Sequence, residues 1–275
     1  MCIALLLSAC SSAPKNPGEV HDMRRRSESQ LEQGNQQAGR GSFDAALVFL
    51  NEALRLAVAT DDSSLRIRAG LSRGNVLFSL GRGDEAAADW NHALNEAVQT
   101  GNRELEALCR LHSARGRLLT TGSSAAQSVR DEVHRELAFI RSDQLSIAFA
   151  WTLAALAEKE LGNFAAAEAA SRRSLGIHER ERNFEFAAYD WFLIASFRSL
   201  SGDFNSARQA LEAAITFDRR VENSWGLAND WRALGDVERR AGSHDAARRA
   251  YLRSAEIFRA IGMDEAAEEA LARSE

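Results

Sequence analysis

Two short stretches of this chain place residue types at spacings that could hold a cofactor or a metal ion. The first, Gly81-Arg82-Gly83-Asp84-Glu85-Ala86, matches the G-x-G-x-x-A pattern of dinucleotide-binding loops. In those loops a β-strand precedes the glycines, and the next helix holds the pyrophosphate at its N-terminus. The residues before Gly81 instead place apolar side chains at helical spacing. We therefore interpret this stretch as a turn between two helices and expect no cofactor.

The second stretch, His178-Glu179-Arg180-Glu181-Arg182, begins like the helix of a zinc protease. Such a helix needs a second histidine four residues after the first, so that both imidazoles lie on one face. Arg182 occupies that position, and none of the other five histidines pairs with another at this spacing (His21, His92, His112, His134 and His244). The sequence also contains neither a P-loop nor a G-x-S-x-G elbow. We therefore predict no catalytic residues, no metal site and no enzymatic activity.

A glycine that returns every 40 residues is the most regular feature of the chain. It precedes an alanine-rich run each time, at Gly41, Gly81, Gly162, Gly202 and Gly242, and a sixth copy at Gly122 is displaced by one residue. A fixed period of this size indicates a solenoid, in which each unit buries its apolar face by stacking on its neighbours. Because Gly122 is displaced and the second half of its unit lacks a bulky aromatic residue, we expect the most irregular hairpin between residues 121 and 161.

Each unit is predicted to be a helical hairpin, with the glycine capping the first helix and a polar turn ending the second. The fold class is therefore all-α, an α-solenoid of six antiparallel helix hairpins plus a C-terminal capping helix at residues 263–273. The expected helices are 22–40, 43–59, 63–80, 83–99, 103–121, 124–140, 143–161, 164–181, 184–201, 204–221, 224–241 and 244–261.

Several columns of the repeat agree with one known family. Small residues stand seven positions before the turn glycine (Gly34, Gly74, Ala114, Ala155, Ala195, Gly235), and large ones stand four positions earlier (Trp151, Trp191, Trp231). The second helix repeats an alanine, a bulky and a small residue, as in Ala86, Trp90 and Ala93. Over residues 22–261 this resembles the tetratricopeptide repeat. The period exceeds that family's usual length of about 34 residues, and the helix-ending proline is missing, so HEAT-like hairpins are an alternative.

The N-terminal residues resemble a bacterial lipoprotein signal. A short apolar run ends in Leu7-Ser8-Ala9-Cys10, although no Lys or Arg precedes Lys15. The resemblance implies a signal peptide at 1–9, lipidation of Cys10, a flexible tether at 10–21 and a repeat domain at 22–275. It also implies a lipid-anchored location in the bacterial cell envelope, at the outer membrane facing the periplasm. A net charge of −5 provides no basic surface for nucleic acid.

In tetratricopeptide arrays the first helix of each hairpin lines a concave groove, which implies partner binding there. The expected stripe runs through Leu31, Leu71 and Leu111 and contains the candidate partner-binding residues Asn35, Arg68, Asn75, Arg115, Phe149, Tyr189, Phe192, Arg232, Asp236 and Arg239. Some family members bind a peptide carboxylate with asparagines at the places of Asn35 and Asn75, but the lysines that assist them are missing here. Arg68 and Arg115 could supply the charge in another geometry.

Helix 184–201 is apolar on more than one side. Tyr189 and Phe192 lie away from the core face formed by Trp191, Ile194 and Ala195, so the two rings either pack between hairpins or form an exposed platform. We expect a protein or peptide partner across Phe149, Tyr189 and Phe192, with an anionic group at Arg232 and Arg239. The alternatives are a small-ligand-binding accessory of a transport system and a self-associating structural protein, which would form a homo-oligomer.

Overall fold

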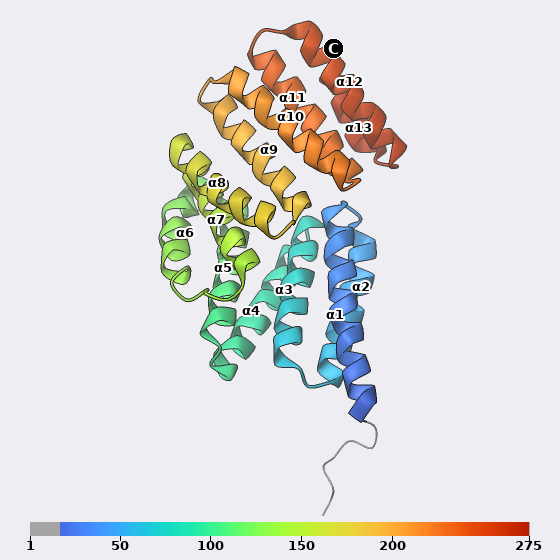
Figure 1. Ribbon diagram of the computed structural model, residues 1–275, viewed down its shortest axis with the longest axis vertical. Helices are drawn as coiled ribbons and strands as arrows, with labels where there is room; N and C mark the ends of the chain where they lie inside the picture. Colours follow the sequence, from blue (N-terminus) through green and yellow to red (C-terminus); the bar gives the residue numbers. More distant parts are fainter. Residues whose placement is uncertain (1–16, 275) are drawn as a thin grey trace, which may run out of the picture.

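The computed structural model describes residues 17–274, and this part of the chain folds into thirteen helices without a strand (Figure 1). Consecutive helices pack in antiparallel pairs, so the predicted solenoid of six hairpins and a capping helix is confirmed. The helices are α1 (Pro17–Gly39), α2 (Phe43–Ala59), α3 (Ser63–Ser79), α4 (Gly83–Thr100), α5 (Arg103–Thr121), α6 (Ser123–Glu136), α7 (Gln144–Glu160), α8 (Phe164–Arg180), α9 (Phe184–Leu200), α10 (Phe204–Arg220), α11 (Ser224–Arg240), α12 (His244–Ala260) and α13 (Asp264–Ala272).

The N-terminal boundary of the helical domain differs from the expectation. Helix α1 begins at Pro17 rather than at residue 22, so residues 17–21 extend the helix instead of the tether. Proline suits the first helical position because its fixed φ is already helical and its missing N–H would have no partner there. The predicted signal peptide and Cys10 lie outside the described residues. Within the described range, no helix is both long and apolar enough to cross a bilayer.

The turn glycines adopt the backbone conformation that the repeat requires. Gly41, Gly81, Gly162, Gly202 and Gly242 all have φ between +75° and +87°. After Gly81, the backbone N–H of Arg82 donates to Leu77 O over 2.9 Å, and this hydrogen bond caps the C-terminal end of α3. Other turns between hairpins adopt the same conformation at Gly101 and at the non-glycine residues Asp61, Arg182 and Glu222.

The small residues of the repeat lie where the two helices of a hairpin cross. A Cβ added at Gly74 would lie 2.5 Å from Trp90 Nε1, and one at Gly235 would lie 2.5 Å from Tyr251 Cε1. Gly34 has the same relation to Leu50. Each of these bulky residues stands sixteen positions after its glycine, so the small and bulky columns of the repeat meet at the helix crossing.

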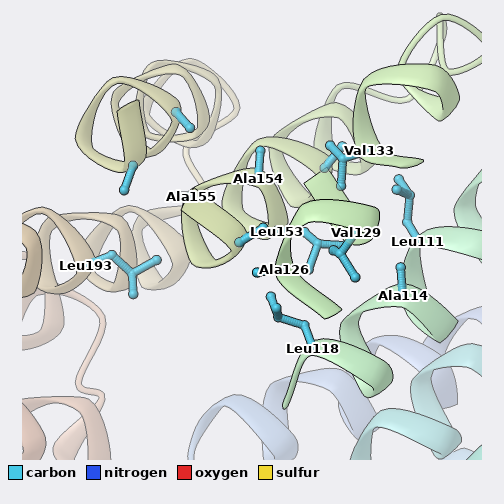
Figure 2. Packing of buried hydrophobic residues seen from close by; sticks show 14 of the residues in the cluster. Leu111, Ala114, Leu118, Ala126, Val129, Val133, Leu153, Ala154, Ala155 and Leu193 are labelled. Atoms are coloured by element: carbon cyan, nitrogen blue, oxygen red, sulfur yellow. The ribbon is translucent and has the colours of Figure 1, made fainter. Parts of the chain in front are cut away.

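The third hairpin is irregular, as predicted. Helix α6 ends at Glu136, and residues 137–143 connect it to α7. The Glu104 carboxylate accepts bonds from the backbone N–H groups of Arg141, Ser142 and Asp143 at 2.9–3.1 Å and from Ser142 Oγ at 2.6 Å, which lowers its pKa to about 2. Behind this connection, leucine, valine and alanine side chains of α5, α6 and α7 point toward one another, with Leu193 of α9 beside them (Figure 2).

The solenoid curves until its first hairpin touches its last two. First helices of neighbouring hairpins contact one another directly (α1 with α3, α3 with α5, α5 with α7, α9 with α11), which places them on the inner side of the curve. The turn after α1 meets α9 and the start of α11, because a Cβ on Gly39 would overlap Glu185 Oε1 and one on Gly41 would lie 2.8 Å from Trp225 Cδ1. Figure 1 shows the ends of α1 and α2 beside α9. The inner faces of α3, α5, α7 and α9 therefore face a common interior.

Candidate partner-binding surface

Helix α9 has two exposed aromatic residues, Phe186 and Tyr189, besides the residues that it buries in the core. The Tyr189 side chain is 42% exposed and Phe186 is 52% exposed, while Phe192 is half-buried. The Tyr189 and Phe192 rings stack with centroids 6.2 Å apart and an interplanar angle of 12°. Ile194 and Ala195 occupy the opposite, buried face, with half-buried Trp191 beside them. The structure therefore exposes Tyr189, whereas half-buried Phe192 packs against core residues of neighbouring hairpins.

Helices α3, α5 and α7 bring a second group of side chains to the same interior. His112 Nδ1 bonds Asn75 Oδ1 over 3.1 Å, and its ring stacks on Phe149 at 4.4 Å. Because Asn75 Oδ1 can only accept, the imidazole carries its proton on Nδ1. Burial, assisted by the charge of Arg115, lowers the pKa of His112 to about 3, so this histidine is neutral. Asn75, His112, Arg115, Phe149, Tyr189 and Phe192 are referred to below as the inner cluster.

Arg115 is the charged member of the inner cluster, and its charge is uncompensated. Its Nη1 is buried without a hydrogen-bond partner, and no carboxylate within residues 17–274 forms an ion pair with it. Burial lowers the pKa of Arg115, and an electrostatic interaction with Tyr189 opposes this shift. A desolvated cation without a counter-ion is costly, so this position favours a bound anion.

The other predicted residues lie apart from this cluster. Asn35 on α1 and Arg68 on α3 are exposed. Arg232 pairs with Glu269 of α13 at 3.3 Å, while Asp236 accepts from Arg239 at 3.1 Å, from Arg273 at 3.1 Å and from Tyr251 Oη at 2.8 Å. The C-terminal arginines are therefore already paired within the chain, and their role as an anion site stays a prediction.

The predicted groove stripe also needs a correction. Leu31, Leu71 and Leu111 are 7%, 2% and 0% exposed and belong to the core instead of the groove surface. Because the first helices of neighbouring hairpins touch, the stripe that follows i, i+3 and i+7 passes through their contact rather than along the open face. Only its positions 75, 115, 149, 189 and 192 reach the inner cluster, and His112, the sixth member, was not predicted.

Two buried polar pairs flank the hairpin α9–α10, and neither was predicted. His178 Nδ1 and Asp190 Oδ2 are 2.7 Å apart, and the same imidazole nitrogen lies 3.4 Å from Ser174 Oγ. A Ser-His-Asp triad needs the two partners on different ring nitrogens, so this group is structural. One repeat later, Asp218 and Asp230 occupy the equivalent positions. The 40-residue period of the sequence could have revealed the relation, because each residue of the second pair stands forty positions after its counterpart in the first.

In the second pair, burial raises the pKa of Asp218 to about 7 and that of Asp230 to about 9. Asp218 accepts from Asn223 Nδ2 at 3.0 Å, while Asp230 Oδ2 is buried without a hydrogen-bond partner among the residues that the structure describes. Within the described residues, no group of three His, Cys, Asp or Glu side chains is arranged to hold a metal ion. Burial thus favours the protonated form of Asp230 at neutral pH.

The outer surface has repeat-related hollows. One of about 520 Å³ lies over Trp231 and is lined by Arg219, Arg249 and Arg253, and another of about 250 Å³ lies between α2, α3 and α4. Most residues that line the smaller hollow occupy the same positions in their repeats as residues that line the larger hollow. These hollows are consequences of hairpin stacking, and their lining changes from repeat to repeat.

Comparison with known proteins places the fold but not the family. No family model matches the sequence, and no curated protein matches it significantly. Among solved structures, the chain is similar to a Rap protein complexed with competence and sporulation factor, with a TM-score of 0.63 and 16% identity over 90% of this chain and 74% of that one.

Two further structures agree with this likeness. PilW, a type IV pilus biogenesis factor, matches with a TM-score of 0.53 and 16% identity over 89% of this chain and 98% of its own. A signal-transduction ATPase with a tetratricopeptide repeat sensor, from Pyrococcus horikoshii, matches with a TM-score of 0.55 and 12% identity over 93% of this chain and 43% of its own. The chain therefore has a tetratricopeptide-like superhelical fold.

Proposed function

We propose that this protein is a lipid-anchored scaffold of the bacterial cell envelope, without enzymatic activity, that holds a protein or peptide partner on its concave face. The observation that carries the proposal is the inner cluster, in which the exposed Tyr189 ring stacks on half-buried Phe192 near an unpaired arginine. Accessible aromatic side chains and arginine are the residue types that dominate binding energy at protein interfaces.

Two further observations support a binding role. Most arginines of the chain form ion pairs with nearby carboxylates, whereas Arg115 has none, so its charge does not stabilise the fold. One solved structure of similar fold holds competence and sporulation factor. An array of this shape offers an extended concave surface to a partner.

The binding site is tested by photo-crosslinking in the native envelope. A photo-reactive phenylalanine analogue replaces Tyr189 in one strain and Val98 in another. Val98 is 51% exposed on α4, a second helix on the outer side, and serves as the matched control. We expect a discrete crosslinked species from position 189 alone. Equal crosslinking from both positions, or none from 189, would contradict the concave-face proposal.

The anchor is tested separately, because Cys10 lies outside the described residues. Cys10→Ser should move the protein from the membrane fraction to the soluble fraction, since acyl chains supply about 0.8 kcal/mol per buried CH₂. Mass spectrometry of the wild-type N-terminus should show a lipid-modified cysteine. A soluble wild-type protein with an unmodified N-terminus would remove the anchor from the proposal and leave the scaffold.

A further inference from the structure

The two hollows of the outer surface occupy equivalent places in their repeats but differ in charge. In the smaller hollow, each arginine is neutralised by a carboxylate of the same lining. Arg73 pairs with Asp89 at 2.5 Å, and Arg82 pairs with Glu85 at 2.7 Å. The smaller hollow therefore has no excess charge, and its polar side chains are satisfied without a ligand.

The larger hollow, formed by α10, α11 and α12 near the C-terminal end of the array, lacks these carboxylates (Figure 1). Ala246 stands at the position that Glu85 has in the smaller hollow. Ala250 stands at that of Asp89, and Arg249 replaces an alanine. Hairpin stacking explains where the hollows lie, but it does not explain why one of them loses two negative charges and gains a positive one.

Three arginines line the larger hollow, and the fold leaves two of them without a counter-ion. Within residues 17–274, neither Arg219 of α10 nor Arg249 of α12 forms an ion pair. Arg249 and Arg253 also stand four residues apart on one helix, a spacing at which like charges repel. The only lining carboxylate, Glu238, is held at 2.6 Å by Arg208, which lies outside the lining. The hollow therefore has an excess of positive charge, which favours a bound anion.

The lining of the larger hollow also includes an indole ring on which nothing in the described chain stacks. Two repeats earlier, the equivalent Trp151 is covered by the guanidinium of Arg173 at 4.3 Å from the ring centroid. Arg253, which corresponds to Arg173, pairs instead with Glu256 at 3.0 Å. Within residues 17–274, Trp231 therefore has neither a stacked guanidinium nor a stacked ring. A flat group of a ligand can occupy the place that Arg173 has over Trp151.

We propose that the larger hollow binds a small molecule in which a flat ring carries a phosphate monoester, with the ring against Trp231 and the phosphate held by Arg219 and Arg249. A phosphate monoester has two negative charges near neutral pH and matches two unpaired guanidinium groups, whereas a carboxylate has one. The volume of about 520 Å³ is that of a small-molecule site. The hollow is separate from the inner cluster, so this inference goes beyond the proposed function.

The experiment measures binding to the full-length protein by equilibrium dialysis at low ionic strength and about pH 8, where the phosphate carries two charges. Phenyl phosphate and adenosine 5′-monophosphate represent a small and a large ring. Phenyl sulfate keeps the shape with one charge less, and inorganic phosphate lacks the ring. The variants are Arg249→Gln, which removes a cation, and Ala246→Glu, which restores the carboxylate of the smaller hollow. Arg248→Gln is the matched control, because Arg248 is an exposed arginine of α12 outside the lining. Circular dichroism checks that each variant is folded.

We expect at least one of the two ring phosphates to bind the wild type, about tenfold or more tightly than phenyl sulfate and inorganic phosphate. Binding should weaken by about the same factor in Arg249→Gln and in Ala246→Glu and stay unchanged in Arg248→Gln. Inorganic phosphate that binds as tightly as both ring phosphates would mean an adventitious ion only. Equal weakening in Arg248→Gln, unchanged binding in Ala246→Glu, or no binding of either ring phosphate would overturn the site.

Discussion

The buried Asp218–Asp230 pair should make the stability of this protein depend on pH, and Asp230→Asn should remove that dependence. Asp230 is 2% exposed and Asp218 is 3% exposed. Burial holds the pKa of Asp230 at about 9 in the folded chain, whereas the unfolded value is near 3.8. A carboxyl group with a raised folded pKa binds its proton more tightly when folded. Its contribution to stability is therefore complete below pH 3.8 and is lost as the pH rises toward 9.

The magnitude follows from one retained proton. Each pH unit between the unfolded and folded pKa values costs about 1.4 kcal/mol of unfolding free energy. From pH 5 to pH 7 the wild type should lose about 3 kcal/mol through this group. In Asp230→Asn the amide donates permanently to Asp218, so this loss is absent and the variant should become the more stable protein toward neutral pH.

Urea unfolding followed by circular dichroism at pH 5, 6 and 7 measures the difference between the two proteins at each pH. Comparing them at the same pH cancels the other carboxylates, including Glu104, whose lowered pKa of about 2 acts at more acid pH. Asp245→Asn, at an exposed position of α12, is the control and should follow the wild type. Parallel pH curves for wild type and Asp230→Asn would refute the raised pKa of Asp230 in the folded chain.

Three other predictions concern packing and backbone. Gly74→Ala should destabilise the fold by about 1–3 kcal/mol in urea unfolding, because the new Cβ would lie 2.5 Å from Trp90 Nε1; an unchanged midpoint would mean that the indole moves freely. Glu222→Gly should raise the unfolding free energy by up to about 1 kcal/mol, because Glu222 has φ +56°, and a loss of stability would contradict this account of the turn. Tyr189→Ala should lower the melting temperature far less than Phe197→Ala, since Tyr189 is 42% exposed and Phe197 is 1% exposed; the fully buried truncation should cost about 3–5 kcal/mol, and equal shifts would place Tyr189 in the core.

The repeat architecture could be predicted because its signals are local. The turn positions need glycine because their φ is positive, and the crossing positions need a small residue such as Gly74 because the two helices approach closely. Both requirements are steric and local, so they can be recognised in the sequence. The displaced Gly122 likewise predicted the irregular third hairpin, because a shift in period must be absorbed by a local connection. The start of α1 was missed, since Pro17 suits both a tether and a first helical turn.

The candidate site was predictable only in part. Helical spacing separated Tyr189 from the core face of its own helix, because that separation depends on residues only a few positions apart. The same spacing assigned Leu71 and Leu111 to the groove, whereas contact between neighbouring first helices buries them. Pairing of Asp236 with Arg239 and Arg273 likewise depends on where α13 packs.

The sequence by itself therefore determined the helical hairpins, their period and the aromatic character of α9, because each depends on residues within one repeat. Only the tertiary structure decided that Arg115 has no counter-ion, that Asp218 meets Asp230, and that the turn at Gly41 reaches Trp225. These features arise from the curvature summed over several repeats and from burial, which sets the electrostatic environment of each charge. Neither quantity is contained in the spacing of residues along one helix.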